Sequence, residues 1–276
     1  MGARVKKFVI VFLSVFAVIC VLLMFFAQNL FYYPERGESR YTPKDFGLLY
    51  ENVTFASIDG TKLHGWFIPS LGEAKGTVVH VHGNAGKLED HLSSIYWIAK
   101  QDYNVLTFDY RGYGLSDDKK PTPKALMEDT KSAIAYAKSR IDVDPNKILI
   151  LAQSIGGNNA IAAVGSGQKS GVRAIVVDST FFSYKTIASD KFFAGGLFVS
   201  DEYSASRFVK NIAPIPTLFI HGTGDEIISY EHSEKLYALA LHPKRLIIVP
   251  HARHISILQN KIYQNEVLKF FDESLK

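Results

Sequence analysis

Residues 146–157 constrain the fold of this chain more than any other stretch. Residues 147–152 are mostly branched and apolar, a pattern typical of a strand buried on both faces of a sheet. A short turn centred on Ser154 follows, and an alanine-rich segment that predicts a helix begins four residues later. A turn this tight needs small residues two positions before and after its centre, and Ala152 and Gly156 satisfy that need. The sequence therefore predicts a strand, a sharp turn and a helix, with Ser154 at the apex.

This context is that of a nucleophile elbow, which exposes a serine hydroxyl above the sheet at a helix N-terminus. The helix dipole there favours developing negative charge. Short motifs also match by chance, and Ala152 replaces the first glycine of the Gly-X-Ser-X-Gly pattern. The turn alone leaves both a catalytic and a purely structural role open for Ser154.

Strand and helix patterns alternate along the rest of the chain. Asp59-Gly60 joins two alternating runs, which predicts a β-hairpin. The predicted strands are 52–58, 62–68, 77–81, 104–108, 147–152, 173–177, 217–220 and 245–249, and the predicted helices are 89–100, 123–139, one from 158, 230–240 and 255–275. This order predicts an α/β fold: a mainly parallel sheet with an antiparallel N-terminal hairpin and helices on both faces.

One stretch, residues 181–213, breaks the alternation with aromatic residues, serine and glycine and no clear strand. We interpret it as a short cap insertion of one or two helices. Its apolar residues Phe192, Phe193, Leu197 and Phe198 are candidates for lining a pocket, although packing of the cap onto the core is the alternative for each.

Composition excludes several classes of function. The net charge is +4 and no long Lys/Arg run occurs, so nucleic-acid binding is not indicated. Cys20 is the single cysteine, which excludes an intrachain disulfide and a zinc site built on cysteines. The chemistry proposed below requires no metal and no organic cofactor.

The N-terminus predicts a membrane anchor. Residues 1–7 form a basic flank and residues 8–27 carry no charge, a length that spans a bilayer as a helix. A cleaved signal peptide and a lipoprotein signal ending at Cys20 are the alternatives, and both fit the long, bulky apolar core less well. The basic flank predicts a single-pass protein with a cytosolic N-terminus and a periplasmic, extracytoplasmic or lumenal domain. Residues 28–47 predict a juxtamembrane linker, with aromatic residues 31–33 at the membrane interface, and residues 48–276 the folded domain.

Polar loops follow the predicted parallel strands at their carboxyl ends, where ligands bind in such sheets. They are His82-Gly83-Asn84-Ala85-Gly86, Asp109-Tyr110-Arg111-Gly112-Tyr113-Gly114-Leu115-Ser116, the turn at Ser154, His221-Gly222-Thr223-Gly224-Asp225 and His251-Ala252-Arg253-His254. We expect these loops to meet on one rim of the sheet.

A serine hydroxyl needs a base within hydrogen-bond reach and a carboxylate that orients the base. The chain order Ser154, Asp225, His254 supplies a nucleophile, an acid and a base, each just after a predicted strand. Asp225 also suits a helix-capping role in its glycine-rich turn. His251 is a competing base, and His254 is preferred because it precedes the last helix directly.

An acyl-transfer site also needs donors for an oxyanion. The backbone N–H of Ile155, next to the nucleophile, is one candidate. The backbone N–H of Asn84, in the loop after the first parallel strand, is the other. His82 in the same loop is assigned to loop structure rather than to chemistry.

Together these motifs resemble α/β-hydrolases of the membrane-anchored type, whose relatives include depalmitoylating thioesterases, monoacylglycerol and lysophospholipid lipases and serine aminopeptidase-like proteins. The resemblance runs from about Tyr32 to the C-terminus and implies Ser154 as nucleophile, Asp225 as acid and His254 as base. The sequence departs from the family pattern at Ala152, at Ile228-Ser229 where Val-Pro is common, and at Arg253 where glycine often precedes the histidine. The last difference affects the mouth of the site.

The expected function is a membrane-anchored serine hydrolase of carboxylic esters or thioesters, with acyl substrates that include lipids. A peptidase on the same three residues is the second hypothesis, with Glu202 and Glu226 as the candidates for binding a peptide amine. A non-catalytic, membrane-tethered binding module is the third.

Overall fold

An eight-stranded sheet forms the centre of the protein, whose computed structural model describes residues 2–26 and 31–276. The spatial order of its strands is β10-β9-β8-β7-β4-β6-β3-β2. Their bounds are β2 Glu51–Ala56, β3 Lys62–Ile68, β4 Gly76–Val81, β6 Tyr103–Phe108, β7 Ile148–Gln153, β8 Val172–Asp178, β9 Thr217–Gly222 and β10 Lys244–Val249. Strand β3 is antiparallel to both β2 and β6, and every other pairing is parallel. The predicted mainly parallel sheet with an antiparallel N-terminal hairpin is confirmed.

Strand β7 shows why these runs are apolar at every position. All of its residues are buried, because helices cover both faces of the sheet. Ile148, Ile150 and Ala152 enter one hydrophobic core, while Leu149 and Leu151 enter the other. Successive side chains of a strand point to opposite faces, so a strand in this position needs apolar residues throughout.

The helices divide between the two faces. Helices α4 (Pro123–Ser139), α5 (Ile155–Gly165) and α8 (Glu231–Leu239) contribute to one core, and α3 (Tyr96–Ala99) and α9 (Lys261–Ser274) contribute to the other. The predicted helix 89–100 is wrong as one element, because the chain there forms α2 (Leu88–His91), a 3₁₀ turn η3 (Leu92–Ser94) and α3. Helix α5 starts directly after Ser154, three residues before the predicted start.

The last helix is shorter than predicted. A 3₁₀ turn, η6 (Ile257–Gln259), precedes α9, and the Asn260 side chain accepts a hydrogen bond from the Ile262 N–H as the N-cap. His254 therefore lies in a loop ahead of both elements and does not begin the helix itself.

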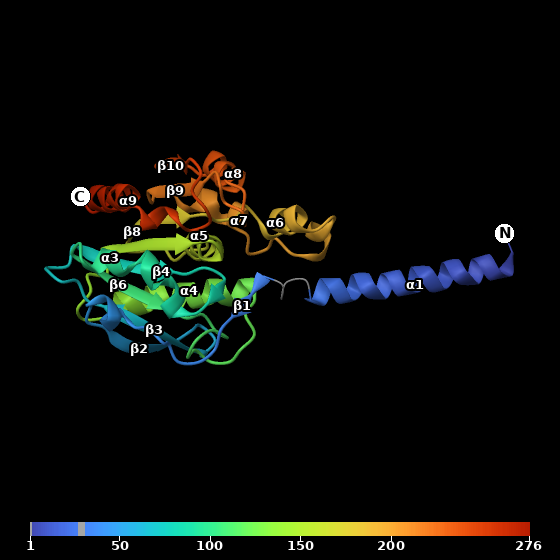
Figure 1. Cartoon of the computed structure of the whole chain (residues 1–276), viewed down its shortest axis with the longest axis horizontal. Coiled ribbons are helices and arrows are strands. Elements are labelled where there is room, and N and C mark those ends of the chain that lie inside the picture. The colour runs from blue at the N-terminus through green and yellow to red at the C-terminus, as the bar shows by residue number, and fades with distance from the viewer. Residues whose placement is uncertain (1, 27–30) are drawn as a thin grey trace.

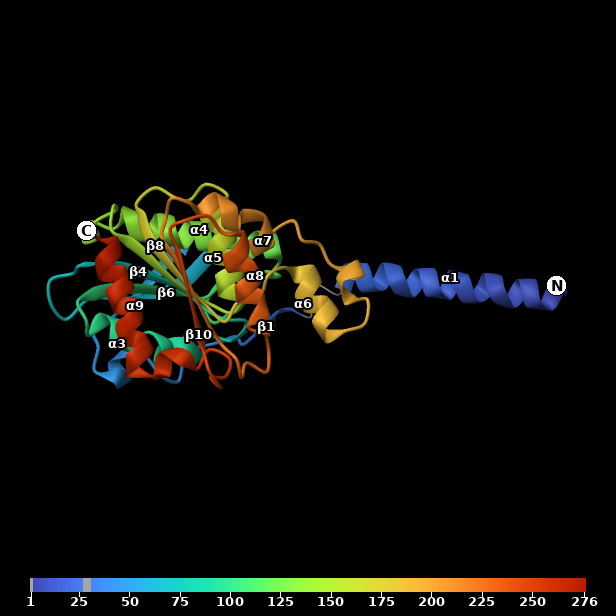
Figure 2. The same cartoon turned by 90° about the horizontal axis from the view of Figure 1, so that it is seen from above.

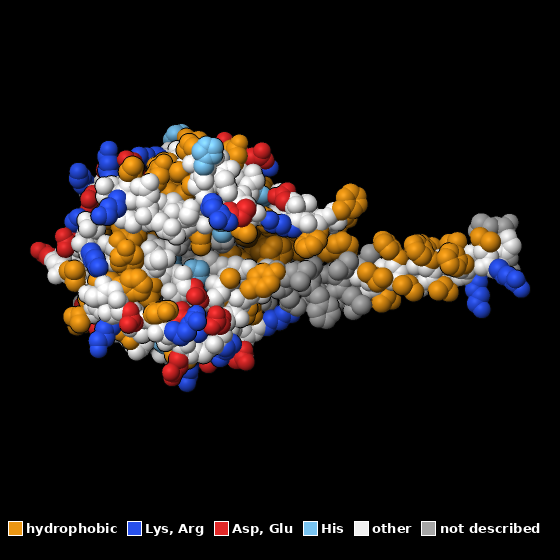
Figure 3. Space-filling model, in the orientation of Figure 1, with side chains coloured by type: hydrophobic (Ala, Val, Ile, Leu, Met, Phe, Trp, Pro, Cys, Tyr) orange, Lys and Arg blue, Asp and Glu red, His pale blue; other side chains and the backbone are white. Residues whose placement is uncertain are grey.

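Helix α1 (Ala3–Phe26) projects away from the sheet domain (Figures 1 and 2). Apolar side chains cover its visible surface in Figure 3, and Phe8 and Ile10 are among those exposed to solvent. Among the described residues, no helix meets the combined requirements of length and apolar content for crossing a membrane. The predicted span 8–27 ends, and the predicted linker 28–47 begins, in residues 27–30, which lie outside the described residues.

The segment after residue 30 is more structured than the predicted linker. Strand β1 (Tyr33–Pro34) pairs in parallel with β5 (Ala85–Gly86), and a 3₁₀ turn η2 spans Pro43–Phe46. The predicted position of the aromatic residues 31–33 at a membrane interface does not fit one of the three, Tyr32. Tyr32 is buried, and Phe31 packs edge-on against Tyr184 with 5.2 Å between ring centroids.

Residues 181–213 contain α6 (Tyr184–Lys191), η4 (Gly195–Phe198), α7 (Ala205–Phe208) and η5 (Val209–Ile212). Helix α6 lies at the end of the domain that faces α1, and η4 contacts α1 (Figures 1 and 2). The expectation that the cap's apolar residues line a pocket is wrong for three of them. Phe192, Phe193 and Leu197 are exposed on its outer turn, with Phe193 102% exposed, and Phe198 is half-buried.

Candidate active site

Ser154 occupies the sharp turn between β7 and α5. Its backbone has φ 54° and ψ −124°, a strained conformation that non-glycine residues seldom adopt. The Ser154 N–H donates to the Asp178 carbonyl oxygen (2.9 Å), and the Thr180 hydroxyl donates to the Ser154 carbonyl oxygen (2.7 Å). These two bonds, from the end of β8 and the loop that follows it, hold the strained residue in place.

Two glycines allow the loops of the rim to approach each other. A Cβ on Gly156 would overlap the carbonyl oxygen of Val81, so the predicted need for a small residue here is explained by the neighbouring loop. A Cβ on Gly222 would overlap the carbonyl oxygen of Ala252, in the loop that carries His254. Without these glycines the loops after β4, β7, β9 and β10 could not converge.

The structure brings together the three side chains that the sequence singles out. The Ser154 Oγ lies 3.1 Å from His254 Nε2, and His254 Nδ1 lies 2.7 Å from Asp225 Oδ2. Because the carboxylate accepts the Nδ1 proton, Nε2 of the neutral imidazole faces the serine as a proton acceptor. Ser154 is 7% exposed and the His254 side chain 14%, so the row is sheltered but open to a small reactant.

Asp225 does not cap helix α8, whose N-cap residue is Tyr230. It bonds to the turn before that helix and to the histidine. Its Oδ1 accepts the N–H groups of Ile227 (2.9 Å) and Ile228 (2.8 Å) in the turn, while Oδ2 accepts the bond from His254. Burial raises the pKa of this carboxyl, but hydrogen bonds from His221, His254 and the Ile228 N–H outweigh burial and lower the pKa below its usual value. Asp225 therefore stays ionised beside the histidine.

His221 is a site residue that the sequence reasoning missed. Its Nε2 lies 3.0 Å from Asp225 Oδ2 and 2.9 Å from the Ile228 carbonyl oxygen, two acceptors that require a proton on this nitrogen. Its Nδ1 then accepts the Ser233 hydroxyl at 2.7 Å. His221 thus holds the same carboxylate oxygen, Oδ2, that accepts the bond from His254. Its position four residues before Asp225 in the quoted motif was the available signal.

His251, the competing base, is not placed for that role. It is exposed, and its backbone N–H donates to the Thr223 hydroxyl at 2.9 Å. The ring beside Ser154 Oγ is that of His254.

The two predicted oxyanion donors flank the nucleophile. Ile155 follows Ser154 directly, and a Cβ on Gly83 would lie 3.6 Å from Ser154 Cβ, so the loop that carries Asn84 packs against the serine. Neither the Asn84 nor the Ile155 N–H donates a hydrogen bond to any residue within 2–26 and 31–276. Both donors are therefore free for a ligand oxygen.

The buried ring of His82 holds this loop from inside the core. It is fully buried, its Nδ1 lies 2.7 Å from the Gly83 carbonyl oxygen, and its ring stacks on His91 with centroids 4.7 Å apart. Burial, together with the neighbouring His91 and His80, lowers the pKa of His82 well below its usual value and keeps it neutral. These contacts agree with the assignment of His82 to loop structure.

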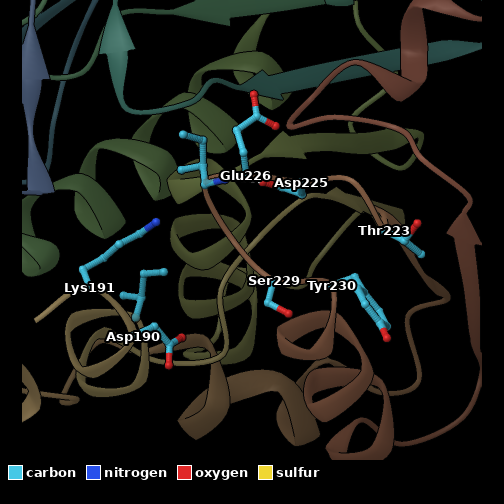
Figure 4. A pocket seen from close by; sticks show the side chains of 9 residues that line it. Asp190, Lys191, Thr223, Asp225, Glu226, Ser229 and Tyr230 are labelled. Atoms are coloured by element: carbon cyan, nitrogen blue, oxygen red, sulfur yellow. Dashed lines mark hydrogen bonds between the residues drawn. The ribbon is translucent and has the colours of Figure 1, made fainter. Parts of the chain in front are cut away.

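A cavity of about 300 Å³ lies between the cap and the loop after β9. Figure 4 shows Asp190 and Lys191 of the cap on one side and the loop with Asp225 on the other. The lining residues are Ile187, Asp190, Lys191, Thr223, Asp225, Glu226, Ile227, Ser229 and Tyr230. The cavity therefore adjoins the acid end of the row, and none of the four apolar cap residues singled out in the sequence is among its lining.

Arg253, which stands where the family pattern often has glycine, lies at the mouth of the site. Its guanidinium lies 2.6 Å from Glu226 Oε1, and the His254 N–H donates to Glu226 Oε2 at 3.4 Å. Glu226 is thus already paired with a cation. Glu202, the other acidic candidate for binding a peptide amine, is exposed on the cap.

Comparisons with known proteins agree with this architecture. The family model described as "Serine aminopeptidase, S33" matches residues 72–199. The protein YfhR of Salmonella typhimurium is 41% identical over 98% of this chain and 96% of its own length. An esterase of Pyrococcus furiosus superposes with a TM-score of 0.71 over 88% of this chain and 98% of its own, at 24% identity. This likeness confirms the predicted fold.

The α/β hydrolase domain-containing protein WAV2 of Arabidopsis thaliana is 32% identical over 79% of this chain and 77% of its own length. The fold, the motifs and these relatives lead to one assignment: the chain belongs to the α/β-hydrolase family.

Proposed function

We propose that the protein is a serine hydrolase that cleaves carboxylic esters or thioesters through an acyl-enzyme. The observation that carries this proposal is the hydrogen-bonded row of Ser154, His254 and Asp225. The N–H groups of Ile155, next to the serine, and of Asn84, in the loop that packs against it, donate no hydrogen bond within the described residues. The esterase of Pyrococcus furiosus among the structural neighbours supports the same class.

In the first half-reaction the Ser154 oxygen attacks the acyl carbonyl carbon while His254 Nε2 takes the hydroxyl proton. The Asn84 and Ile155 N–H groups bind the oxyanion of the tetrahedral intermediate. The intermediate collapses when the bond to the leaving oxygen or sulfur breaks, and His254 returns its proton to that atom. Water then attacks the acyl-enzyme by the same route and releases the acid and free Ser154.

A peptidase on the same three residues is the second candidate, favoured by the description of the matching family as a serine aminopeptidase. A peptide N-terminus would need an uncommitted carboxylate near the mouth. Glu226 forms an ion pair with Arg253 instead. This pairing favours neutral acyl substrates over peptides.

A substrate panel separates the two candidates. Chromogenic short-chain esters, long-chain acylglycerols and acyl thioesters should each be compared with aminoacyl amides by kcat/KM. We expect at least one ester or thioester to exceed every amide by about 100-fold, because the oxyanion donors serve both reactions whereas the Glu226 carboxylate is paired with Arg253. Faster cleavage of an aminoacyl amide would assign the peptidase instead.

We also propose that the N-terminal segment attaches the enzyme to a membrane, with its N-terminus cytosolic and its domain on the opposite side. Helix α1 exposes Phe8, Ile10 and Phe12, a surface that water solvates poorly. The full chain should partition with membranes and require detergent for release, and a protease added outside intact cells or spheroplasts should reach the domain. Release by high salt alone would refute the attachment, and protection of the domain would reverse the orientation.

A further inference from the structure

The segment that follows α1 lies against the loop that carries the proposed oxyanion donor Asn84. Strand β1 pairs with β5, with Tyr33 beside Ala85 and Pro34 beside Gly86. The Glu35 N–H donates to the Gly86 carbonyl oxygen at 3.1 Å. The same segment is bound on its other side, because the Gly114 N–H donates to the Glu35 carbonyl oxygen at 2.8 Å. Residues 33–35 therefore form a strap between two loops of the rim.

This strap holds Asn84 directly. The Tyr33 N–H donates to Asn84 Oδ1 at 3.2 Å. The buried Tyr113 hydroxyl lies 2.7 Å from the Asn84 carbonyl oxygen and 3.3 Å from its Oδ1. Both acceptors of Asn84 are thus held by other residues, while its N–H makes no bond to the described part of the chain. Such an arrangement fixes the peptide and leaves the donor available.

Two charged residues that follow β5, Glu89 and Lys87, bind the strap and the residues just after it. The buried Glu89 carboxylate accepts the backbone N–H groups of Arg40 and Tyr41, and the Arg40 side chain lies 3.1 Å from it. Lys87, 4% exposed, lies 3.2 Å from Glu35 Oε1 and donates to the Glu38 carbonyl oxygen at 2.9 Å. Buried charges with this many partners resist displacement, because leaving one unpaired is costly.

We propose that Tyr33 and the Asn84 side chain are positioning residues for the oxyanion donor, so that the segment after α1 is a working part of the active site. This inference rests on the proposed serine hydrolase function. Hydrolysis is then coupled to the N-terminal segment: a change that pulls residues 33–35 away from β5 slows the reaction without touching Ser154, His254 or Asp225.

Two substitutions isolate the contact between the strap and the loop. Tyr33→Pro removes the N–H donor. Leu49→Ala is the control, because it deletes an apolar side chain that is 78% exposed and lies outside the strap. Asn84→Ala removes the Oδ1 acceptor but keeps the backbone N–H proposed as oxyanion donor. Tyr113→Phe removes the hydroxyl that contacts the Asn84 carbonyl oxygen and Oδ1. It replaces Tyr33→Pro in the experiment if that variant does not fold.

The variants are compared in the full-length, detergent-solubilised protein with a chromogenic ester, and kcat is normalised to active sites titrated with a fluorophosphonate. We expect Tyr33→Pro and Asn84→Ala each to lower kcat by about tenfold with KM within about twofold, a partial form of the loss caused by removing an oxyanion donor. The double variant should resemble Asn84→Ala, because that substitution already deletes the bond that Tyr33→Pro removes. Leu49→Ala should retain the parent kcat, and Tyr113→Phe should lower it.

Unchanged kcat per titrated site in Asn84→Ala, with only a lower melting temperature, would show a purely structural contact and overturn the inference. If the two tenfold losses multiplied, so that kcat of the double variant fell by about 100-fold, the direct link between Tyr33 and Asn84 would be overturned. Ser154→Ala, with its rate normalised to protein concentration because no serine is left to titrate, separates failure of the inference from failure of the proposed function. If it is inactive while Asn84→Ala and Tyr113→Phe match the parent, the inference fails and the function stands; if it is as active as the parent, both fail.

Discussion

Replacing Ser154 with alanine is expected to lower kcat for an acyl ester by about a millionfold, because the reaction loses its nucleophile and the pathway through an acyl-enzyme. His254 and the free N–H groups of Asn84 and Ile155 remain, so substrate binding and a small residual rate persist. The folded domain should persist as well, since the Ser154 hydroxyl bonds only to His254 among the described residues. Steady-state kinetics and a melting curve measure both effects.

Ser139→Ala is the matched control, because Ser139 lies at the end of α4 and bonds only to the Tyr136 carbonyl oxygen in the described structure. It should keep the parent kcat. Equal ester hydrolysis by Ser154→Ala and the parent would leave the protein with a different nucleophile. An inactive parent, tested on the whole substrate panel, would favour the non-catalytic binding module.

Asp225→Asn is expected to lower kcat by about 10,000-fold, because it places the ring proton of His254 on the wrong nitrogen. The Ile227 and Ile228 N–H groups bind Oδ1, so the amide oxygen of asparagine takes that position. Its NH₂ group then replaces Oδ2 and faces His254 Nδ1 and His221 Nε2. His254 Nδ1 must then accept a hydrogen bond from this NH₂ group, so the proton of the neutral ring lies on Nε2. In that tautomer Nε2 can no longer accept the serine proton.

The expected signature is a fall in kcat with little change in KM. Asp142→Asn, which alters an exposed carboxylate paired with Arg140, is the control and should retain full activity. If Asp225→Asn kept more than about a tenth of the parent kcat, the carboxylate would not orient the base, and the assignment of Asp225 would be withdrawn.

The sequence predicted the sheet and the converging residues because their signals are local. A buried strand is apolar at each position, and a tight turn needs small neighbours, so Ser154 was recognisable from its own surroundings. Asp225 and His254 follow strands in a parallel sheet, whose carboxyl ends share one edge. Their convergence therefore follows from topology.

The missed features depend on contacts between segments far apart in the chain. Tyr33 pairs with Ala85 across more than 50 residues, and two residues are too short a run to show a strand pattern. Phe193 and its neighbours are candidates for a pocket or for packing onto the core because they are apolar, yet they are exposed, and composition cannot tell a buried cap position from an exposed one. His221 required the three-dimensional turn that brings its ring to Asp225.

The most direct test of the account is the position of the covalent adduct formed by a fluorophosphonate on the full-length protein. Digestion and mass spectrometry should find a single adduct, on the Ser154 oxygen, with labelling slowed strongly in His254→Ala and absent in Ser154→Ala. An adduct on another residue, or equal labelling of the parent and Ser154→Ala, would contradict the proposed chemistry.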